Sequence, residues 1–227
     1  TGFGKVVLRM ASILVMVFPI LLVLFADSSI SKRIRCYCGI LLGCVLSGII
    51  AIKSRGAWLC STVVAPMVVF KYILVSKKHL IVTFLVIISV VGVFVTSPLM
   101  GTRFKSITNL NTNKSNISRI YLWQSSINML KEHPYSGVGL GYFKEEYESK
   151  YENKRDPKKI YPGLTTAHSN IFQVSAETGI IGFSGFIIFT AFMILNNFKV
   201  WLKTRNPYAL MLFGMWLGFT VYGIFDY

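Results

Sequence analysis

Two arginines and one histidine in this sequence have side chains suited to chemistry on a phosphate-bearing substrate. Arg55 lies between two apolar runs, Arg119 precedes an amphipathic repeat, and His168 is followed by Ser-Asn. A guanidinium group pairs with phosphate oxygens through two parallel hydrogen bonds, and a neutral imidazole can accept a proton from a hydroxyl group. These three residues are our candidates for stabilising an anionic leaving group and for activating an acceptor hydroxyl.

Each candidate also has a purely structural interpretation. An arginine near the end of an apolar run can extend its guanidinium group to the membrane surface. An arginine on an amphipathic helix can simply face solvent, and a single histidine can serve the fold alone. Spacing leaves both interpretations of Arg55, Arg119 and His168 open.

The segment after Arg119 has the apolar spacing of one helix face. Its apolar residues recur every three or four positions, at Ile120, Trp123, Ile127 and Leu130. Ser118 is a good N-cap, and Pro134 ends the helix. Arg119 would then be the first helical residue, where free N–H groups and the helix dipole already favour an anion.

A glycine-rich segment follows this predicted helix, with glycines at Gly137, Gly139 and Gly141. It is not a dinucleotide-binding fingerprint, because the third glycine comes too early and no strand precedes it. The spacing predicts a backbone that turns tightly or approaches another group closely.

Metal ligands are not expected in this sequence. Glu145, Glu148 and Glu152 could share a helix face, but the lysines among them favour a solvated charged surface. The four cysteines lie in or beside apolar runs without a metal-binding spacing, so we expect them to be packing residues. No cofactor is expected either.

A second helix is predicted around His168. With Thr165 or Thr166 as its N-cap, the helix contains His168 in its first turn and continues past Glu177 into an apolar run. Asn170 follows two residues later in the stretch that opens this helix.

The composition indicates which kind of secondary structure positions these residues. A soluble globular chain has about 25% charged residues, whereas this chain of 227 residues has 15% charged and 53% hydrophobic residues and a mean hydropathy of +0.57. Six nearly charge-free stretches approach the roughly 20 residues that an α-helix needs to cross a bilayer: 10–26, 36–52, 57–70, 80–100, 178–198 and 206–225. We predict an all-α polytopic membrane protein with about six transmembrane helices, and a soluble enzyme or a disordered chain is excluded.

The net charge of +15 could suggest a nucleic-acid partner, but its distribution indicates a lipid bilayer instead. Basic residues cluster in three short connections, at Lys32, Arg33 and Arg35, at Lys71, Lys77 and Lys78, and at Lys199, Lys203 and Arg205. The positive-inside rule places all three clusters in the cytoplasm. The long segment between the fourth and fifth spans then lies outside. We therefore expect four transmembrane helices in residues 1–97, a large external loop with amphipathic helices and the catalytic elements in 98–167, and a loop-exit helix with two more spans in 168–227.

Four motifs, taken in order, resemble the bacterial O-antigen ligase and polymerase family. They are Ser54-Arg55-Gly56, Arg119 with Trp123, His133-Pro134 followed by the three glycines up to Gly141, and His168-Ser169-Asn170 followed by Glu177-Thr178-Gly179. The resemblance covers about residues 40–195.

The resemblance implies a metal-independent membrane glycosyltransferase at the outer, periplasmic face of the bacterial cytoplasmic membrane. The family's donor is a glycan on undecaprenyl diphosphate, and its acceptor is lipid A core, another lipid-linked repeat or a protein. By resemblance, the catalytic residues are Arg55, Arg119 and His168. The same two arginines and the remaining motif residues are expected to contact substrate: Trp123, Gly137, Gly139, Gly141, Asn170 and Glu177. The first residue is not methionine, and we expect a piece of a longer protein of roughly 10–14 spans.

The alternative is a transporter or flippase of lipid-linked oligosaccharides. Such proteins commonly have internal repeats and charges near the membrane midplane, and neither feature is evident in this sequence. Whether a family enzyme acts as ligase, polymerase or protein glycosyltransferase depends on acceptor surfaces that the motifs do not specify. The motifs also specify neither the glycan nor the oligomeric state.

Overall fold

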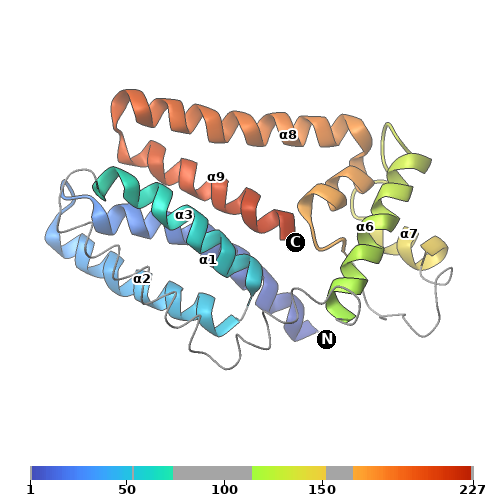
Figure 1. Ribbon diagram of the computed structural model, residues 1–227, viewed down its shortest axis with the longest axis horizontal. Coiled ribbons are helices and arrows are strands. Elements are labelled where there is room, and N and C mark those ends of the chain that lie inside the picture. Colours follow the sequence, from blue (N-terminus) through green and yellow to red (C-terminus); the bar gives the residue numbers. More distant parts are fainter. Residues whose placement is uncertain (1, 53, 74–113, 152–165, 226–227) are drawn as a thin grey trace. The chain divides into compact units, whose positions relative to one another are not determined.

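The computed structural model describes residues 2–52, 54–73, 114–151 and 166–225, and all regular structure in these ranges is helical. The chain divides into two compact units, one formed by residues 1–83 and 187–227 and the other by residues 84–186. The α-helices of each unit are labelled in Figure 1.

The first unit is a bundle of long apolar helices. It contains α1 (Gly2–Ala26), α2 (Lys32–Ile52), α3 (Arg55–Ile73), α9 (Pro207–Phe225) and the second half of α8 (Asn170–Thr204). α1 packs against α2, α3 and α9, and α3 also packs against α9 (Figure 1). The charge-free stretches form these helices because a helix satisfies every backbone polar group within its own segment.

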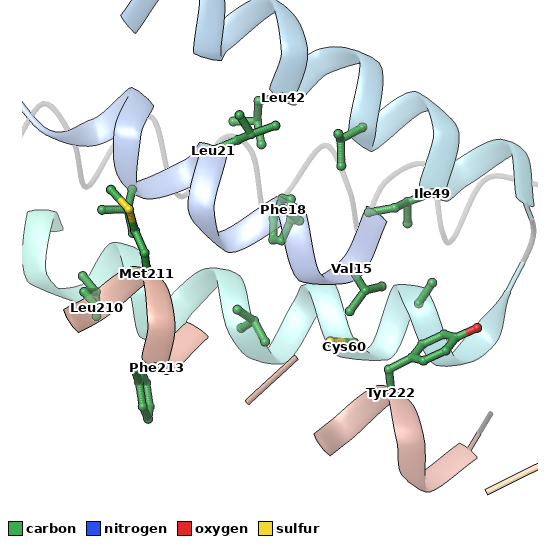
Figure 2. Packing of buried hydrophobic residues seen from close by; sticks show 14 of the residues in the cluster. Val15, Phe18, Leu21, Leu42, Ile49, Cys60, Leu210, Met211, Phe213 and Tyr222 are labelled. Atoms are coloured by element: carbon green, nitrogen blue, oxygen red, sulfur yellow. The ribbon is translucent and has the colours of Figure 1, made fainter. Parts of the chain in front are cut away.

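The core of this bundle combines interlocking apolar side chains with a close backbone approach. Val15 of α1, Cys60 of α3 and Tyr222 of α9 are all buried in it (Figure 2). The Cys60 thiol donates a hydrogen bond to the carbonyl of Gly218, at 3.3 Å. A Cβ atom on Gly218 would lie 3.3 Å from the Val15 carbonyl oxygen, so a small residue here lets the helices pack closely, as membrane helices commonly do.

Three helices within the described ranges are long and apolar enough to cross a membrane, namely α2, α8 and α9. Shorter apolar helical stretches are Met10–Ala26 in α1 and Gly56–Pro66 in α3. The prediction of an all-α membrane protein is thus confirmed, and five of the six predicted stretches lie in helices. The stretch 80–100 falls outside the described residues, so the number of six spans and the external loop remain predictions.

The second unit is small and built on α6 (Lys114–Glu132), α7 (Phe143–Glu146), a π-helical turn η1 (Tyr147–Tyr151) and the start of α8. Its buried apolar cluster comprises Leu122, Met129, Phe143, Tyr147, Ala167 and Ala176. The Phe143 and Tyr147 rings are parallel, with centroids 6.3 Å apart. This cluster fixes the segments that carry the candidate residues 119 and 168.

The predicted boundaries of the first amphipathic helix are correct at one end only. α6 ends at Glu132, next to the predicted stop at Pro134. It begins at Lys114, so Ser118 is a buried helical residue and the predicted N-cap is wrong. No proline or glycine interrupts residues 114–118, and nothing local therefore prevents the helix from extending by another turn.

The charged segment after the glycines forms a paired surface. The Lys144 and Lys150 ammonium groups each lie beside a glutamate on the same helical stretch, Glu148 and Glu146 respectively. This supports the predicted solvated charged face for these residues. Glu152 falls outside the described residues.

Candidate active site

The His168 backbone lies just before α8 and not inside it. α8 begins at Asn170, and His168 has a left-handed φ of 51°. The prediction that His168 belongs to the first helical turn, capped by Thr166, is therefore wrong. The alternative cap, Thr165, falls outside the described residues.

A side chain from within α8 explains this late helix start. The Ala167 N–H donates to the Gln173 Oε1 atom at 2.7 Å. Backbone N–H groups near a helix start need partners, and a side chain that reaches back from the helix can supply one. The backbone before Asn170 is thus satisfied without helical geometry.

The strained backbone at His168 is stabilised through Ala167, whose N–H and carbonyl are both hydrogen-bonded. A left-handed conformation costs a non-glycine residue about 1–2 kcal/mol and persists where neighbouring contacts hold it. The Ala167 carbonyl accepts a hydrogen bond from the Trp123 Nε1–H at 3.0 Å. The Trp123 ring also stacks on Phe172, with centroids 5.1 Å apart and planes at 17°. Side chains from α6 and α8 therefore fix both backbone polar groups of Ala167.

The glycine-rich segment packs directly against a kink in α8. Gly179 has φ 63° and ψ −166°, which interrupts the helix. The kink frees two carbonyls, so the Val138 N–H donates to the Ala176 oxygen at 2.9 Å and the Gly139 N–H donates to the Glu177 oxygen at 3.0 Å. These bonds join the segment after α6 to the helix that follows His168.

Two glycines make this approach possible. Gly137 has φ 68°, and a Cβ atom there would lie 2.5 Å from the Glu177 carbonyl oxygen. A Cβ atom on Gly179 would overlap the carbonyl of Tyr135. The prediction of a close backbone approach at Gly137 is confirmed, and its counterpart is Gly179.

The other two glycines lie further along the same segment, with Gly139 half-buried and Gly141 exposed. Gly139 and Gly141 have φ values of 107° and 81°, and the Tyr142 N–H donates to the Gly139 carbonyl at 3.2 Å. A Cβ atom on Gly141 would meet nothing within 4 Å. The predicted contact of these three glycines with substrate remains a prediction.

Arg119 lies in the second turn of α6, because the helix begins at Lys114. The predicted anion site at the first helical residue is therefore not formed by Arg119. Residues four apart share one face of a helix, about 6 Å apart along its axis. Arg119 is half-buried on the face that carries Trp123, and Trp123 is bonded to the residue before His168. The structure thus brings the backbones at 119 and 168 into one neighbourhood.

Arg55 occupies the helix position that was predicted for Arg119. It is the first residue of α3, after Ser54, whose hydroxyl oxygen accepts the Ala57 N–H at 3.3 Å as an N-cap does. Arg55 belongs to the first unit and the other two candidates to the second. Its side chain falls outside the described atoms, and its convergence with Arg119 and His168 remains a prediction.

Comparison with known proteins identifies the family. The family model of the O-antigen ligases matches residues 39–187, which include all three candidate residues. The chain belongs to the O-antigen ligase family. An uncharacterized protein of Haemophilus influenzae is 26% identical over 169 residues, which are 69% of this chain and 41% of that protein. The chain thus spans less than half the length of this relative.

Membership confirms the resemblance found in the motifs. In this O-antigen ligase family chain, the motif residues after His168 point largely inward. Ser169 is 1% exposed, and Glu177 is 8% exposed with its Oε1 atom accepting a hydrogen bond from the Gln173 Nε2–H at 2.8 Å. Asn170 is half-buried at the start of α8. Contact of Asn170 or Glu177 with substrate remains a prediction.

Gln173 is the residue that the sequence analysis missed. Its spacing from Glu177, four residues along a helix, is the usual spacing of a side-chain hydrogen bond within a helix. That signal was present in the sequence. Its significance depends on the contact with Ala167, which no local pattern reveals.

A separate polar cluster joins the end of α6 to α7 and η1. Within the described ranges, Glu132, His133 and Glu146 offer ligand atoms within 4.8 Å of one another. The Lys150 ammonium already contacts both carboxylates, at 3.6 Å from Glu132 and closer to Glu146. The pKa of Glu132 is lowered by the neighbouring Tyr151 hydroxyl and by the Lys150 charge. A cation at this cluster would therefore compete with Lys150.

Proposed function

We propose that this protein transfers a glycan from undecaprenyl diphosphate to an acceptor hydroxyl at the outer face of the bacterial cytoplasmic membrane. Family membership supports the reaction class. The observation that carries the assignment to this site is the bond from Trp123 to Ala167, since it holds the face of α6 bearing Arg119 against the segment bearing His168. Lipid A core, a second lipid-linked repeat and a protein are the candidate acceptors.

In the proposed reaction an acceptor hydroxyl attacks the anomeric carbon of the donor sugar. The bond between that carbon and the diphosphate oxygen breaks, and the diphosphate leaves with increased negative charge. His168 accepts the hydroxyl proton or orients the hydroxyl, a role worth about 10²–10⁴ in rate. Arg119 and Arg55 stabilise the leaving diphosphate, since guanidinium groups bind phosphate oxygens in bidentate fashion. No metal or cofactor is part of this proposal.

The charge pattern supports an external site. In the sequence, Lys199, Lys203 and Arg205 follow the apolar stretch 178–198, and His168 precedes it. By the positive-inside rule we expect the basic cluster in the cytoplasm and His168, one apolar stretch away, outside. The transporter alternative is not favoured, because the matched family is that of the O-antigen ligases.

The decisive test is genetic and uses the full-length protein. Cells that lack the gene and express Arg119→Ala or His168→Ala should make no transferred or polymerised surface glycan on a gel, although the variants reach the membrane. Loss of all attached polymer identifies a ligase, and single capped repeats identify a polymerase. Wild-type glycan in either alanine variant contradicts the proposal, and full activity in Arg119→Lys contradicts bidentate recognition.

Sidedness can be tested with two exposed positions. Leu140 is 76% exposed in the glycine segment, and Lys203 is exposed near the end of α8. A membrane-impermeant thiol reagent should label Leu140→Cys in intact cells and leave Lys203→Cys unlabelled until the membrane is opened, with the native cysteines as background. The reverse pattern excludes an external site.

A further inference from the structure

Gln173 contacts the residues on both sides of His168. Its side-chain Oε1 atom accepts the Ala167 N–H at 2.7 Å. Its own backbone N–H donates to the Ser169 carbonyl at 2.9 Å. One residue thus bonds a backbone group of the residue before His168 and a backbone group of the residue after it, on either side of its strained backbone.

The other end of the Gln173 amide is also held. The Nε2–H donates to the Glu177 Oε1 atom at 2.8 Å, and Gln173 is 3% exposed. Because Ala167 offers a donor and Glu177 an acceptor, the amide can face only one way. A buried amide left without either partner would be destabilising, so this orientation is strongly preferred.

The contact is part of a longer series of hydrogen bonds. The Glu177 backbone carbonyl accepts the Gly139 N–H, and the Ala167 carbonyl accepts from Trp123. The glycine segment and α6 are therefore both tied to the backbone that Gln173 holds. A displacement of the Gln173 amide would release the residue before His168 on one side.

We propose that Gln173 is a positioning residue for His168, with Glu177 as the acceptor that orients its amide. This inference rests on the proposed function of His168 and extends it to two buried groups. The left-handed backbone of His168 sets the direction of its imidazole, and that backbone needs the Ala167 N–H to be engaged outside a helix. Without Gln173 the segment can relax toward an ordinary helical start, which redirects the imidazole.

If Gln173 only fills space in the interior, a residue of similar size should replace it without loss of activity. Three variants distinguish this role from the positioning of His168. Gln173→Met keeps the approximate size and removes both polar functions. Gln173→Glu keeps an acceptor for Ala167 but places a second carboxylate beside Glu177. The double variant Q173E/E177Q restores one donor and one acceptor with their positions exchanged.

We expect Gln173→Met and Gln173→Glu each to lower the transfer rate at saturating donor by about tenfold or more, the effect of losing a buried hydrogen bond. Q173E/E177Q should recover most of the loss in Gln173→Glu, as a coupled pair does in a double-mutant cycle. Ser175→Ala is the matched control, because Ser175 is buried on the same helix and its hydroxyl donates to the Phe172 carbonyl of that helix; this variant should keep its activity. Full activity in Gln173→Met, or no recovery in the double variant, overturns the inference.

A second measurement tests the hydrogen bond of the Ala167 N–H without any activity assay. Amide hydrogen exchange at Ala167, in the full-length protein in detergent, should be faster by about tenfold or more in Gln173→Met than in wild type or Ser175→Ala. Unchanged exchange at Ala167 overturns the inference even if activity falls. Faster exchange together with wild-type glycan in His168→Ala would instead show that the contact exists and that the proposed function is wrong.

Discussion

Gly137→Ala tests the close approach that joins the glycine segment to α8. Gly137 and Gly141 both have positive φ values, 68° and 81°. A left-handed alanine costs about 1–2 kcal/mol at either position. The two sites differ in what the new methyl group meets, since at Gly137 it would lie 2.5 Å from the Glu177 carbonyl oxygen and at Gly141 it meets nothing within 4 Å.

The clash at Gly137 should separate the glycine segment from α8 and break the bonds from Val138 and Gly139 to that helix. A backbone hydrogen bond contributes about 0.5–1.5 kcal/mol. The two bonds and the conformational term together predict a loss of about 2–5 kcal/mol in the free energy of unfolding for Gly137→Ala, against about 1–2 kcal/mol for Gly141→Ala.

The assay is the unfolding of the second unit in detergent-solubilised full-length protein, followed by protease sensitivity of residues 134–142 across a denaturant series. Gly185→Ala is a second control, because Gly185 is helical and its new methyl group would meet nothing within 4 Å; it should not destabilise the protein. If Gly137→Ala loses no more stability than Gly141→Ala, the hydrogen-bonded approach to α8 does not stabilise the unit and the reasoning is wrong.

Two further predictions concern the contacts of α6. Trp123→Phe keeps an aromatic ring but removes the donor to the Ala167 carbonyl, so transfer should slow by about tenfold, measured as donor turnover in membranes; an unchanged rate would show that this bond does not position the site. Lys150→Met should raise the pKa of Glu132 toward its ordinary value of 4.5. A lowered pKa stabilises the folded state above the ordinary value and loses this effect as pH falls below it, so the variant should lose less stability on acidification below pH 4.5 in a thermal unfolding series; equal acid sensitivity would contradict the ion pair.

Much of the helical framework could be predicted from local signals. The charge-free stretches predicted the positions of α2 and α9 closely, because a run without charge is compatible with the bilayer only as a helix. Pro134 predicted the end of α6, since proline cannot continue the hydrogen-bonding pattern. The close backbone approach at Gly137 was among the outcomes predicted from residue type, because glycine has no Cβ atom.

The helix starts at the site could not be predicted in the same way. Ser118 and Thr166 both have the residue type of an N-cap, but the helix starts four residues before Ser118 and four after Thr166. A cap residue forms a cap only if its backbone leaves the helix there. At α8 the helix start depends on Gln173, whose side-chain amide accepts the Ala167 N–H from inside the helix.

The sequence by itself determined the class of protein, the apolar helices and the residues that could act on a phosphate-bearing donor. These features depend on composition, periodicity and proline, which act over one or two turns. Only the tertiary structure decided how His168 is held, because the bond between Trp123 and Ala167 joins residues 44 positions apart and the Gly179 kink is stabilised by the segment that follows α6. Hydrogen bonds of such long range depend on how separate helices pack, and no local pattern of residues encodes them.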